Sequence, residues 1–257
     1  MPRKPLILVT NDDGITAPGI RTLINVMTTI GDVVVVAPDS PQSGMGHAIT
    51  IDSTLYVEKV VIDDGPQQEY SCSGTPADCV KLAIREVLDR KPDLCVSGIN
   101  HGSNSSINVI YSGTMSAALE AGIEQIPAIG FSLLDYSWGA DFEHCKSVVK
   151  TITKNVLNHG LPKDVILNVN IPKNQNAING IKICRQARAN WEEKFDKRTN
   201  PMGKDYYWLT GEFVIMDHGE DTDEWALKNN YVSVVPVQFD LTAHHAIQHL
   251  NSWKFES

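Results

Sequence analysis

Two adjacent acidic residues follow the first apolar run of the chain. The segment Thr10-Asn11-Asp12-Asp13-Gly14 comes directly after Leu6-Ile7-Leu8-Val9, a run that predicts a buried strand. Neighbouring like charges at a strand end are unfavourable unless a cation neutralises them, and a divalent metal ion on oxygen ligands is the simplest neutraliser. Asn-Asp-Asp-Gly is also a favourable turn sequence, so this segment alone leaves a metal site and a solvated turn open.

Two further loops carry oxygen ligands directly after predicted strands. Ser43 lies in a polar loop after the strand at residues 33–37, and Asn100 follows the strand at residues 93–98. The carboxyl ends of parallel strands meet at one sheet edge, so these loops should converge. Singly, each residue is explained as well by a loop hydrogen bond or a turn. Together they favour a hard-oxygen site for Mg²⁺, Mn²⁺ or Ca²⁺. We expect one divalent ion, Mg²⁺ or Mn²⁺, on Asp12, Asp13, Ser43 and Asn100.

A predicted helix begins at Tyr111-Ser112-Gly113-Thr114 and continues to about Glu124. The unpaired N–H groups and the positive dipole end of a helix start bind anions such as phosphate. Ordinary capping by Ser112 or Thr114 is compatible with that role. We predict substrate contacts from these residues: Asn11, Asn104, Ser112, Gly113 and Thr114.

Three other polar groups have simpler explanations. Thr75-Pro76-Ala77-Asp78 is a helix-start box, so capping accounts for Asp78 without catalysis. His245 and His249 have metal-ligand spacing but lack the Glu of His-Glu-x-x-His and a third ligand, which favours a surface or interface role. His101 lies in the candidate site loop and is either a proton donor or a loop histidine.

Strand-like and helix-like segments alternate over most of the chain. Apolar runs at residues 6–10 and 33–37 flank a helical pattern, which gives a βαβ unit and a parallel sheet. The pattern predicts an α/β fold with a Rossmann-like, doubly wound, mostly parallel sheet over residues 1–172, and a C-terminal β/α extension over residues 173–257 that suits subunit contacts. Further elements are expected as strands (residues 48–62, 93–98, 128–131, 165–169, 206–209 and 231–237) and helices (residues 75–88, 142–159, 223–230 and 243–252).

Composition narrows the classes of partner. The 257 residues carry a net charge of −9, which argues against a nucleic-acid duplex bound through a basic surface. The sequence has no apolar stretch of signal-peptide or membrane-spanning type, so we expect a cytoplasmic protein without membrane contact. The cysteines show no zinc spacing and are expected as free thiols: Cys72, Cys79, Cys95, Cys145 and Cys184.

These motifs together resemble the SurE survival-protein family of nucleotidases. The resemblance is carried in order along the whole chain by Thr10–Gly14, Ala37-Pro38-Asp39 with Ser43-Gly44, Gly74–Val80, Ser97–Asn100 with Gly102 and Asn104, Tyr111–Thr114, Leu167–Pro172, Tyr206–Leu209, Val232–Pro236 and Asp240-Leu241-Thr242. Two departures lie near the substrate mouth: Ser105-Ser106-Ile107-Asn108 replaces a Gly-Asp-like stretch, and His101 replaces a small or apolar residue.

The resemblance implies a metal-dependent nucleotidase that hydrolyses nucleoside 5′- and 3′-monophosphates or other small phosphomonoesters. It also implies a C-terminal arm exchanged between subunits of a homodimer or homotetramer, and it assigns the metal to Asp12, Asp13, Ser43 and Asn100. In the predicted reaction a metal-activated water attacks phosphorus. Asp12, or Asp13, would orient or deprotonate the water, while Asn104 and Ser112 would stabilise the developing charge.

Two rival functions are kept open. A phosphatase with a phospho-aspartate intermediate usually has Asp-x-Asp after the first strand, and here Asn11 stands two residues before Asp13. A non-catalytic nucleotide-binding regulator would share the sheet and the anion-binding helix start, but it would not require four metal ligands.

Overall fold

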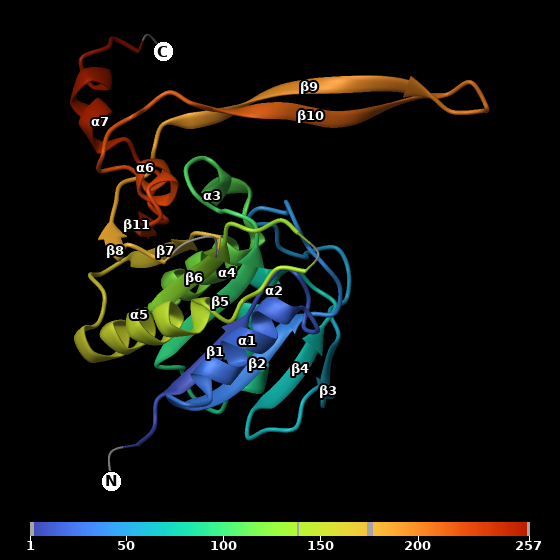
Figure 1. Cartoon of the computed structure of the whole chain (residues 1–257), viewed down its shortest axis with the longest axis vertical. Coiled ribbons are helices and arrows are strands. Elements are labelled where there is room, and N and C mark those ends of the chain that lie inside the picture. Colours follow the sequence, from blue (N-terminus) through green and yellow to red (C-terminus); the bar gives the residue numbers. More distant parts are fainter. Residues whose placement is uncertain (1–2, 138, 174–176, 256–257) are drawn as a thin grey trace.

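A nine-stranded sheet forms the centre of the molecule (Figure 1). The computed structural model describes residues 3–137, 139–173 and 177–255. The strand order is β3-β4-β2-β1-β5-β6-β7-β11-β8. All neighbours are parallel except the β3–β4 and β7–β11 pairs. The strands from the first part of the chain are β1 (Leu6–Thr10), β2 (Asp32–Pro38), β3 (Val57–Val60), β4 (Gln68–Cys72), β5 (Leu94–His101), β6 (Ala128–Leu133) and β7 (Val165–Ile171).

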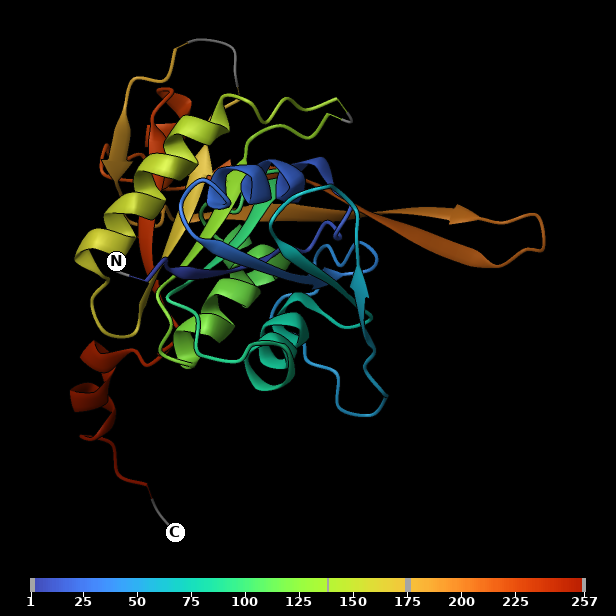
Figure 2. The same cartoon turned by 90° about the horizontal axis from the view of Figure 1, so that it is seen from below.

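Helices cover both faces of this sheet, which explains why its central strands are continuously apolar. Helices α1 (Pro18–Met27) and α5 (Cys145–His159) pack on one face. Helices α2 (Pro76–Leu82) and α4 (Gly113–Ile123) pack on the other, as Figure 2 shows from below. The predicted α/β, doubly wound architecture is confirmed.

The order of the strands reverses at β1. From β1 the chain passes through α1 to β2 on one side, and the later strand β5 pairs on the other side of β1. Open sheets bind ligands outside the carboxyl ends of the strands at such a reversal. The end of β1 is where Asp12 and Asp13 stand, so the topology places this pair in the crevice.

The C-terminal extension contributes to the same sheet and also projects away from it. Strands β8 (Ile181–Ile183) and β11 (Val232–Gln238) continue the sheet beyond β7. Strands β9 (Ala189–Thr199) and β10 (Asp205–Ile215) form a separate antiparallel hairpin, called the arm here, which runs out over the short helix α3 (Asn108–Tyr111) (Figure 1). The domain boundary at residue 172 stays a prediction.

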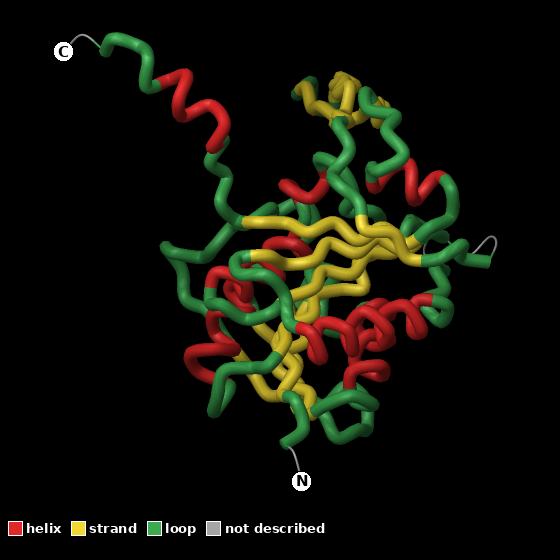
Figure 3. The backbone as a smooth tube through the Cα atoms, turned by 90° about the vertical axis from the view of Figure 1, so that its left-hand side faces the viewer, coloured by secondary structure: helices red, strands yellow, loops and turns green. Residues whose placement is uncertain are grey.

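Two short helices complete the extension. Helix α6 (Asp223–Lys228) packs against β11, whereas α7 (His244–Leu250) has no buried residue. Figure 3 shows the segment with α7 projecting from the body of the molecule. None of the helices in the described ranges is long and apolar enough to cross a membrane.

The structure differs from the expected elements at the β3–β4 edge. Of the extended segment at residues 48–62, only Val57–Val60 forms a strand, and β4 was not expected because its sequence is polar. Glu69 of β4 is buried because Arg21 pairs with both of its carboxylate oxygens, at 2.7 and 2.6 Å. The helix expected at residues 75–88 is α2 followed by a π-helical turn, η1 (Ala83–Val87).

Candidate metal and phosphate site

The two acidic residues after β1 point into different parts of one site. Asp12 is buried and accepts a hydrogen bond from the Thr114 hydroxyl at the start of α4. Asp13 is half-buried, and its Oδ2 accepts from the backbone N–H of His101, 3.1 Å away, at the end of β5. The pair therefore joins three elements that lie far apart in the sequence.

The electrostatics of this pair fit a bound cation. Burial, and then the neighbouring charge of Asp13, raise the pKa of Asp12 to about 6. Burial also raises the pKa of Asp13, against the opposing effect of the His101 N–H. Within the described residues, no Lys, Arg or His side chain forms an ion pair with either carboxylate. A buried and a half-buried carboxylate side by side, neither of them in an ion pair, are a donor set that a divalent ion stabilises.

A buried acceptor next to the pair supports the same conclusion. Asn11 donates from Nδ2 to the carbonyl of Gly14 at 2.8 Å and closes the turn, while φ of Gly14 is +95°. Asn11 Oδ1 is buried and has no hydrogen-bond partner in the part of the chain that the structure describes. Orphaned buried acceptors are rare, and a cation or water satisfies them. The turn is therefore formed, and the metal site and substrate contact by Asn11 stay predictions.

The loop that carries Ser43 is tied to the end of β1. The N–H of Gln42, one residue before Ser43, donates to the carbonyl of Asp12 at 2.7 Å. The N–H of Gly46 donates to the carbonyl of Tyr111 at 3.1 Å. Ser43 itself is exposed. These two hydrogen bonds link the loop to the residues after β1 and to those before α4, and contact of the Ser43 hydroxyl with a metal stays a prediction.

A buried glutamate of α4 holds the same loop through an ion pair. Glu120 of α4 pairs with His47 at 2.9 Å and with Lys81 at 2.6 Å. Burial alone would raise the pKa of Glu120, but these two hydrogen bonds outweigh it and hold the pKa below its usual value. Glu120 was not predicted from the sequence. The only indication there was an acidic residue on a helix that otherwise carries apolar and small residues.

Asn100 presents an amide oxygen beside the pair. Its Nδ2 donates to the carbonyl of Gly102 at 2.7 Å, which leaves the oxygen for a ligand. The pairing of β5 with β6 is interrupted between Ser97 and Asn100. Gly98 is required there, because its φ is +123° and a Cβ would lie 2.3 Å from the carbonyl oxygen of Phe131. This irregularity separates the ligand-bearing end of β5 from its regular part.

The start of α4 packs directly on Asp12. Ser112 is the N-cap, and its Oγ accepts from the N–H of Met115 at 3.0 Å. A Cβ on Gly113 would lie only 2.7 Å from Cβ of Asp12, so glycine permits this approach. The predicted helix start and cap are confirmed. The first turn of α4 thus lies against Asp12, and any N–H group there that Ser112 and Asp12 do not occupy would be available to phosphate.

Asn104 is held in a buried polar network. Its Nδ2 donates to Ser132 Oγ at 2.8 Å, and its backbone groups bond the side chains of Asn170 and Asn168, both at 2.8 Å. An amide NH₂ has two hydrogens, so one remains for a substrate oxygen. Sequence reasoning did not assign Ser132, Asn168 or Asn170. The available signal was two asparagines at alternate positions of a buried strand.

The remaining polar groups have structural roles. The Thr75–Asp78 capping box is confirmed, with both reciprocal hydrogen bonds present. His245 and His249 are exposed on α7, and no group of three or more His, Cys, Asp or Glu suited to a metal occurs in the described residues. All five cysteines are free and buried, as expected.

His101 has a second contact beside the site. Its Nε2 lies 2.5 Å from the carbonyl oxygen of Ser137 and so fastens the loop after β6. Next to it, a cavity of about 220 Å³ is lined by residues that include Asp13, His101 and Phe142. The contact explains His101 as a loop histidine, and a proton-donor role stays untested.

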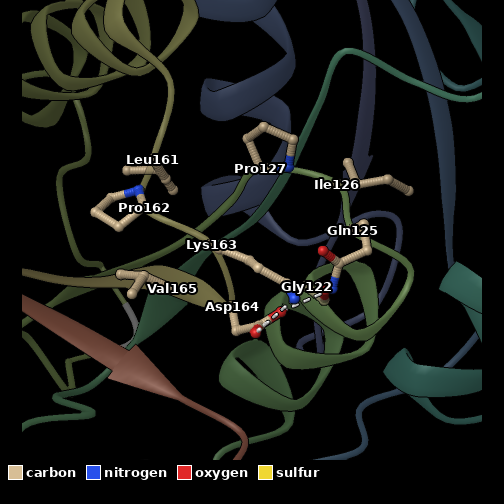
Figure 4. A pocket seen from close by; sticks show the side chains of 9 residues that line it. All are labelled: Gly122, Gln125, Ile126, Pro127, Leu161, Pro162, Lys163, Asp164 and Val165. Carbon is tan, nitrogen blue, oxygen red and sulfur yellow. Dashed lines mark hydrogen bonds and ion pairs between the residues drawn. The ribbon is translucent and has the colours of Figure 1, made fainter.

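A pocket at the opposite edge of the sheet is unrelated to this chemistry. It has a volume of about 110 Å³ and lies before the amino ends of β6 and β7 (Figure 4). Gln125 there donates to Asp164 Oδ1 at 2.9 Å, so its polar groups are partly paired with each other. The acidic pair, by contrast, stands at the carboxyl end of β1, where ligands of open sheets bind.

Comparison with known proteins identifies the family. Residues 7–193 match the family model described as survival protein SurE. A protein from Christiangramia forsetii named 5′-nucleotidase SurE is 74% identical over 98% of this chain and 97% of its own length. One of the same name from Bacteroides fragilis is 47% identical over 98% of both chains.

A solved structure agrees with the sequence relatives. The crystal structure of the SurE protein from Aquifex aeolicus is 42% identical and superposes with a TM-score of 0.83, covering 96% of this chain and 98% of that one. The match extends over the sheet, the site loops and most of the C-terminal extension. The chain therefore belongs to the SurE family.

Proposed function

We propose that this protein is a metal-dependent phosphomonoesterase that hydrolyses nucleoside 5′-monophosphates, and 3′-monophosphates as well, to nucleoside and phosphate. The observation that carries the proposal is two adjacent carboxylates, buried Asp12 packed on the start of α4 and half-buried Asp13, with no ion pair from either one to a side chain in the described ranges. The relatives named 5′-nucleotidase support the substrate class.

The proposed metal ligands are Asp12, Asp13, Ser43 and Asn100. A divalent ion, Mg²⁺ or Mn²⁺, fits their hard oxygen atoms, and when bound it supplies Lewis-acid polarisation and lowers the pKa of water. The protein's own contribution is to hold these oxygens at one sheet edge by hydrogen bonds, on the loops after β1 and β2 and at the end of β5, where Asn100 lies within the strand and not after it as expected.

The side chains around the reacting phosphate have separable tasks. Asp12 is positioned by the Thr114 hydroxyl, and beside the metal its carboxylate would orient or deprotonate the attacking water. The N–H groups at the start of α4, the Ser112 hydroxyl and the Asn104 amide would donate to the equatorial oxygens. These donors are held in place before substrate binds, because Ser112 caps the helix and Asn104 is fixed by Ser132.

We also propose that the arm and the terminal segment hold subunits together in a homodimer or homotetramer. The arm is a two-stranded hairpin, which is marginal in water unless it packs against something. Several of its large apolar side chains are exposed, among them Phe195, Tyr207, Trp208 and Leu209, and so are Leu241 and Phe255 beyond β11. Exposed apolar surface of this kind marks a contact with another chain.

The first test is metal dependence. Hydrolysis of p-nitrophenyl phosphate and of a nucleotide panel should stop in EDTA and return on addition of Mg²⁺ or Mn²⁺. Asp12→Asn and Asp13→Asn should remove most of this activity without unfolding the protein, because each takes away a charge that the metal needs. Steady-state kinetics and circular dichroism measure the two effects.

Asp32→Asn is the matched control, since Asp32 is exposed at the start of β2, far from the carboxyl end of β1. Full activity in EDTA, or near-normal turnover of both site variants in saturating metal, would contradict the metal assignment. Tight nucleotide binding without any hydrolysis would instead indicate the non-catalytic regulator. A phospho-enzyme trapped by acid quench would indicate the phospho-aspartate mechanism.

The second test concerns the phosphate donors. Ser112→Ala should lower kcat by roughly 10²-fold while changing KM less, because a donor aimed at developing charge acts mainly in the transition state. Thr222→Ala is the control, since Thr222 caps α6 in the same way by accepting from the N–H of Trp225. If both variants lose only thermal stability, Ser112 is a cap and nothing more.

The third test concerns assembly. Light scattering on the full chain should show at least a dimer at micromolar concentration. Removal of the chain after Pro172 should leave an aggregating or monomeric core of lower thermal stability, because β7 loses β11 and the buried Val232 and Val234. A full-length protein that is monomeric and fully active would rule out the exchanged arm and leave the metal site unaffected.

A further inference from the structure

A large groove lies between the root of the arm and the body of the molecule. Its volume is about 570 Å³. Figure 1 shows the arm running over α3, and the groove lies in this region. Its walls come from the Ser43 loop, from α3 and from both strands of the arm, and they consist of Gly44, Asn108, Tyr111, Trp191, Glu193, Leu209, Thr210 and Gly211.

The groove begins where the candidate phosphate site ends. Gly44 is the neighbour of Ser43, and Tyr111 is the neighbour of the helix cap Ser112. The hydrogen bond from the N–H of Gly46 to the carbonyl of Tyr111 holds these two walls together. A nucleotide with its phosphate at the start of α4 can therefore extend its nucleoside part into this groove.

Two aromatic rings offer flat surfaces in the groove. The Trp191 indole is fixed by a hydrogen bond from Nε1 to Asn108 Oδ1 at 2.9 Å and by the ring of Phe213 at a centroid distance of 5.2 Å. Its side still open to solvent, and the more exposed Tyr111, are suited to stacking. Every base has a flat π-face, so stacking on an aromatic side chain does not depend on which base is bound.

Glu193 adds a group that distinguishes one base from another. Strand alternation puts Trp191 and Glu193 on the same face of the arm, and Glu193 lies opposite Gly211, a residue without a side chain, in the neighbouring strand. The Glu193 carboxylate makes no hydrogen bond or ion pair with other described residues. An ionised carboxylate only accepts hydrogen bonds, so it is complementary to an edge that only donates.

We propose that this groove binds the base of the substrate nucleotide and that Glu193 makes guanine the preferred base. Guanine presents two adjacent donors, N1–H and the 2-amino group, which a carboxylate can bind in a bidentate manner. Hypoxanthine has only the N1–H there, and adenine has a single amino group and an acceptor nitrogen. The inference rests on the proposed nucleotidase function and adds its base specificity.

The test compares substrates that share the phosphate and differ in the base. The full-length protein should hydrolyse GMP with a higher kcat/KM than IMP or AMP. Glu193→Gln should lower kcat/KM for GMP about tenfold or more, through KM, because a hydrogen bond to a charged group is lost. It should leave p-nitrophenyl phosphate, which has no base, unchanged. Glu192→Gln is the matched control, because it removes the same charge on the opposite face of the same strand.

Binding provides a readout independent of turnover. Guanosine should bind the wild-type protein in calorimetry, bind Glu193→Gln at least tenfold more weakly, and bind Glu192→Gln as it binds the wild type. Trp191→Leu should weaken guanosine and adenosine alike. Equal guanosine affinity of wild type and Glu193→Gln, or parallel loss of GMP and p-nitrophenyl phosphate hydrolysis, would overturn the inference.

Two further outcomes separate this inference from the proposals above. If no phosphomonoester is hydrolysed, the proposed function is wrong, and the guanosine titration still tests whether the groove binds the base. If Glu193→Gln or Trp191→Leu changes the molecular mass in light scattering without changing nucleoside affinity, the groove is a contact between copies of the chain and the base site is wrong.

Discussion

The architecture of the site depends on one unfavourable interaction, the placement of two adjacent carboxylates at the end of the central strand. Burial and the charge of Asp13 raise the pKa of Asp12 from 3.8 to about 6. A shift of this size corresponds to about 3 kcal/mol against the ionised form. That is a substantial part of the roughly 5–15 kcal/mol by which a domain is stable. This free-energy cost has to be compensated by another interaction, and a bound divalent cation would do so by neutralising the two carboxylates.

The surrounding structure holds in place the residues proposed to bind such a cation and the phosphate. The Ser43 loop is tied to Asp12 and Tyr111 by backbone hydrogen bonds and to α4 through the buried Glu120. Asn104 is fixed by the buried Ser132–Asn168–Asn170 network. Buried polar groups that are fully hydrogen-bonded give a single rigid arrangement. Donors that are already oriented lose little entropy when charge develops on a substrate, which is how such sites favour a transition state.

The local sequence pattern predicted those helices and strands whose structure depends mainly on their own residues. Apolar runs predicted β1, β2, β5, β6 and β7, and capping residues predicted the starts of α2 and α4. The loops after β1, β2 and β5 could be placed at one edge because parallel strands leave no alternative. The family resemblance added the nucleotidase function.

Long-range pairing could not be predicted in this way. Strand β4 is polar and is paired with β2 and β3, and its buried Glu69 pairs with Arg21, which lies 48 residues away. Ser105 and Ser106 bond Glu224 and Asp223 of α6 across more than 110 residues, and no local pattern announces this. The residues predicted as metal ligands and substrate contacts belong to elements whose ends meet at one edge of the sheet, and their roles stay predictions.

Thermal unfolding of the metal-free protein tests the central claim most directly. Because the pKa of Asp12 is raised, the folded state binds its proton more tightly than the unfolded state. This stabilisation is complete below pH 3.8 and is lost as pH rises through about 6. Asp12→Asn should therefore raise Tm by several degrees at pH 8 and little below pH 3.8, and Mn²⁺ should raise Tm at pH 8 for the wild type only. Equal Tm values for both proteins across this range, with no effect of Mn²⁺ on the wild type, would contradict the account.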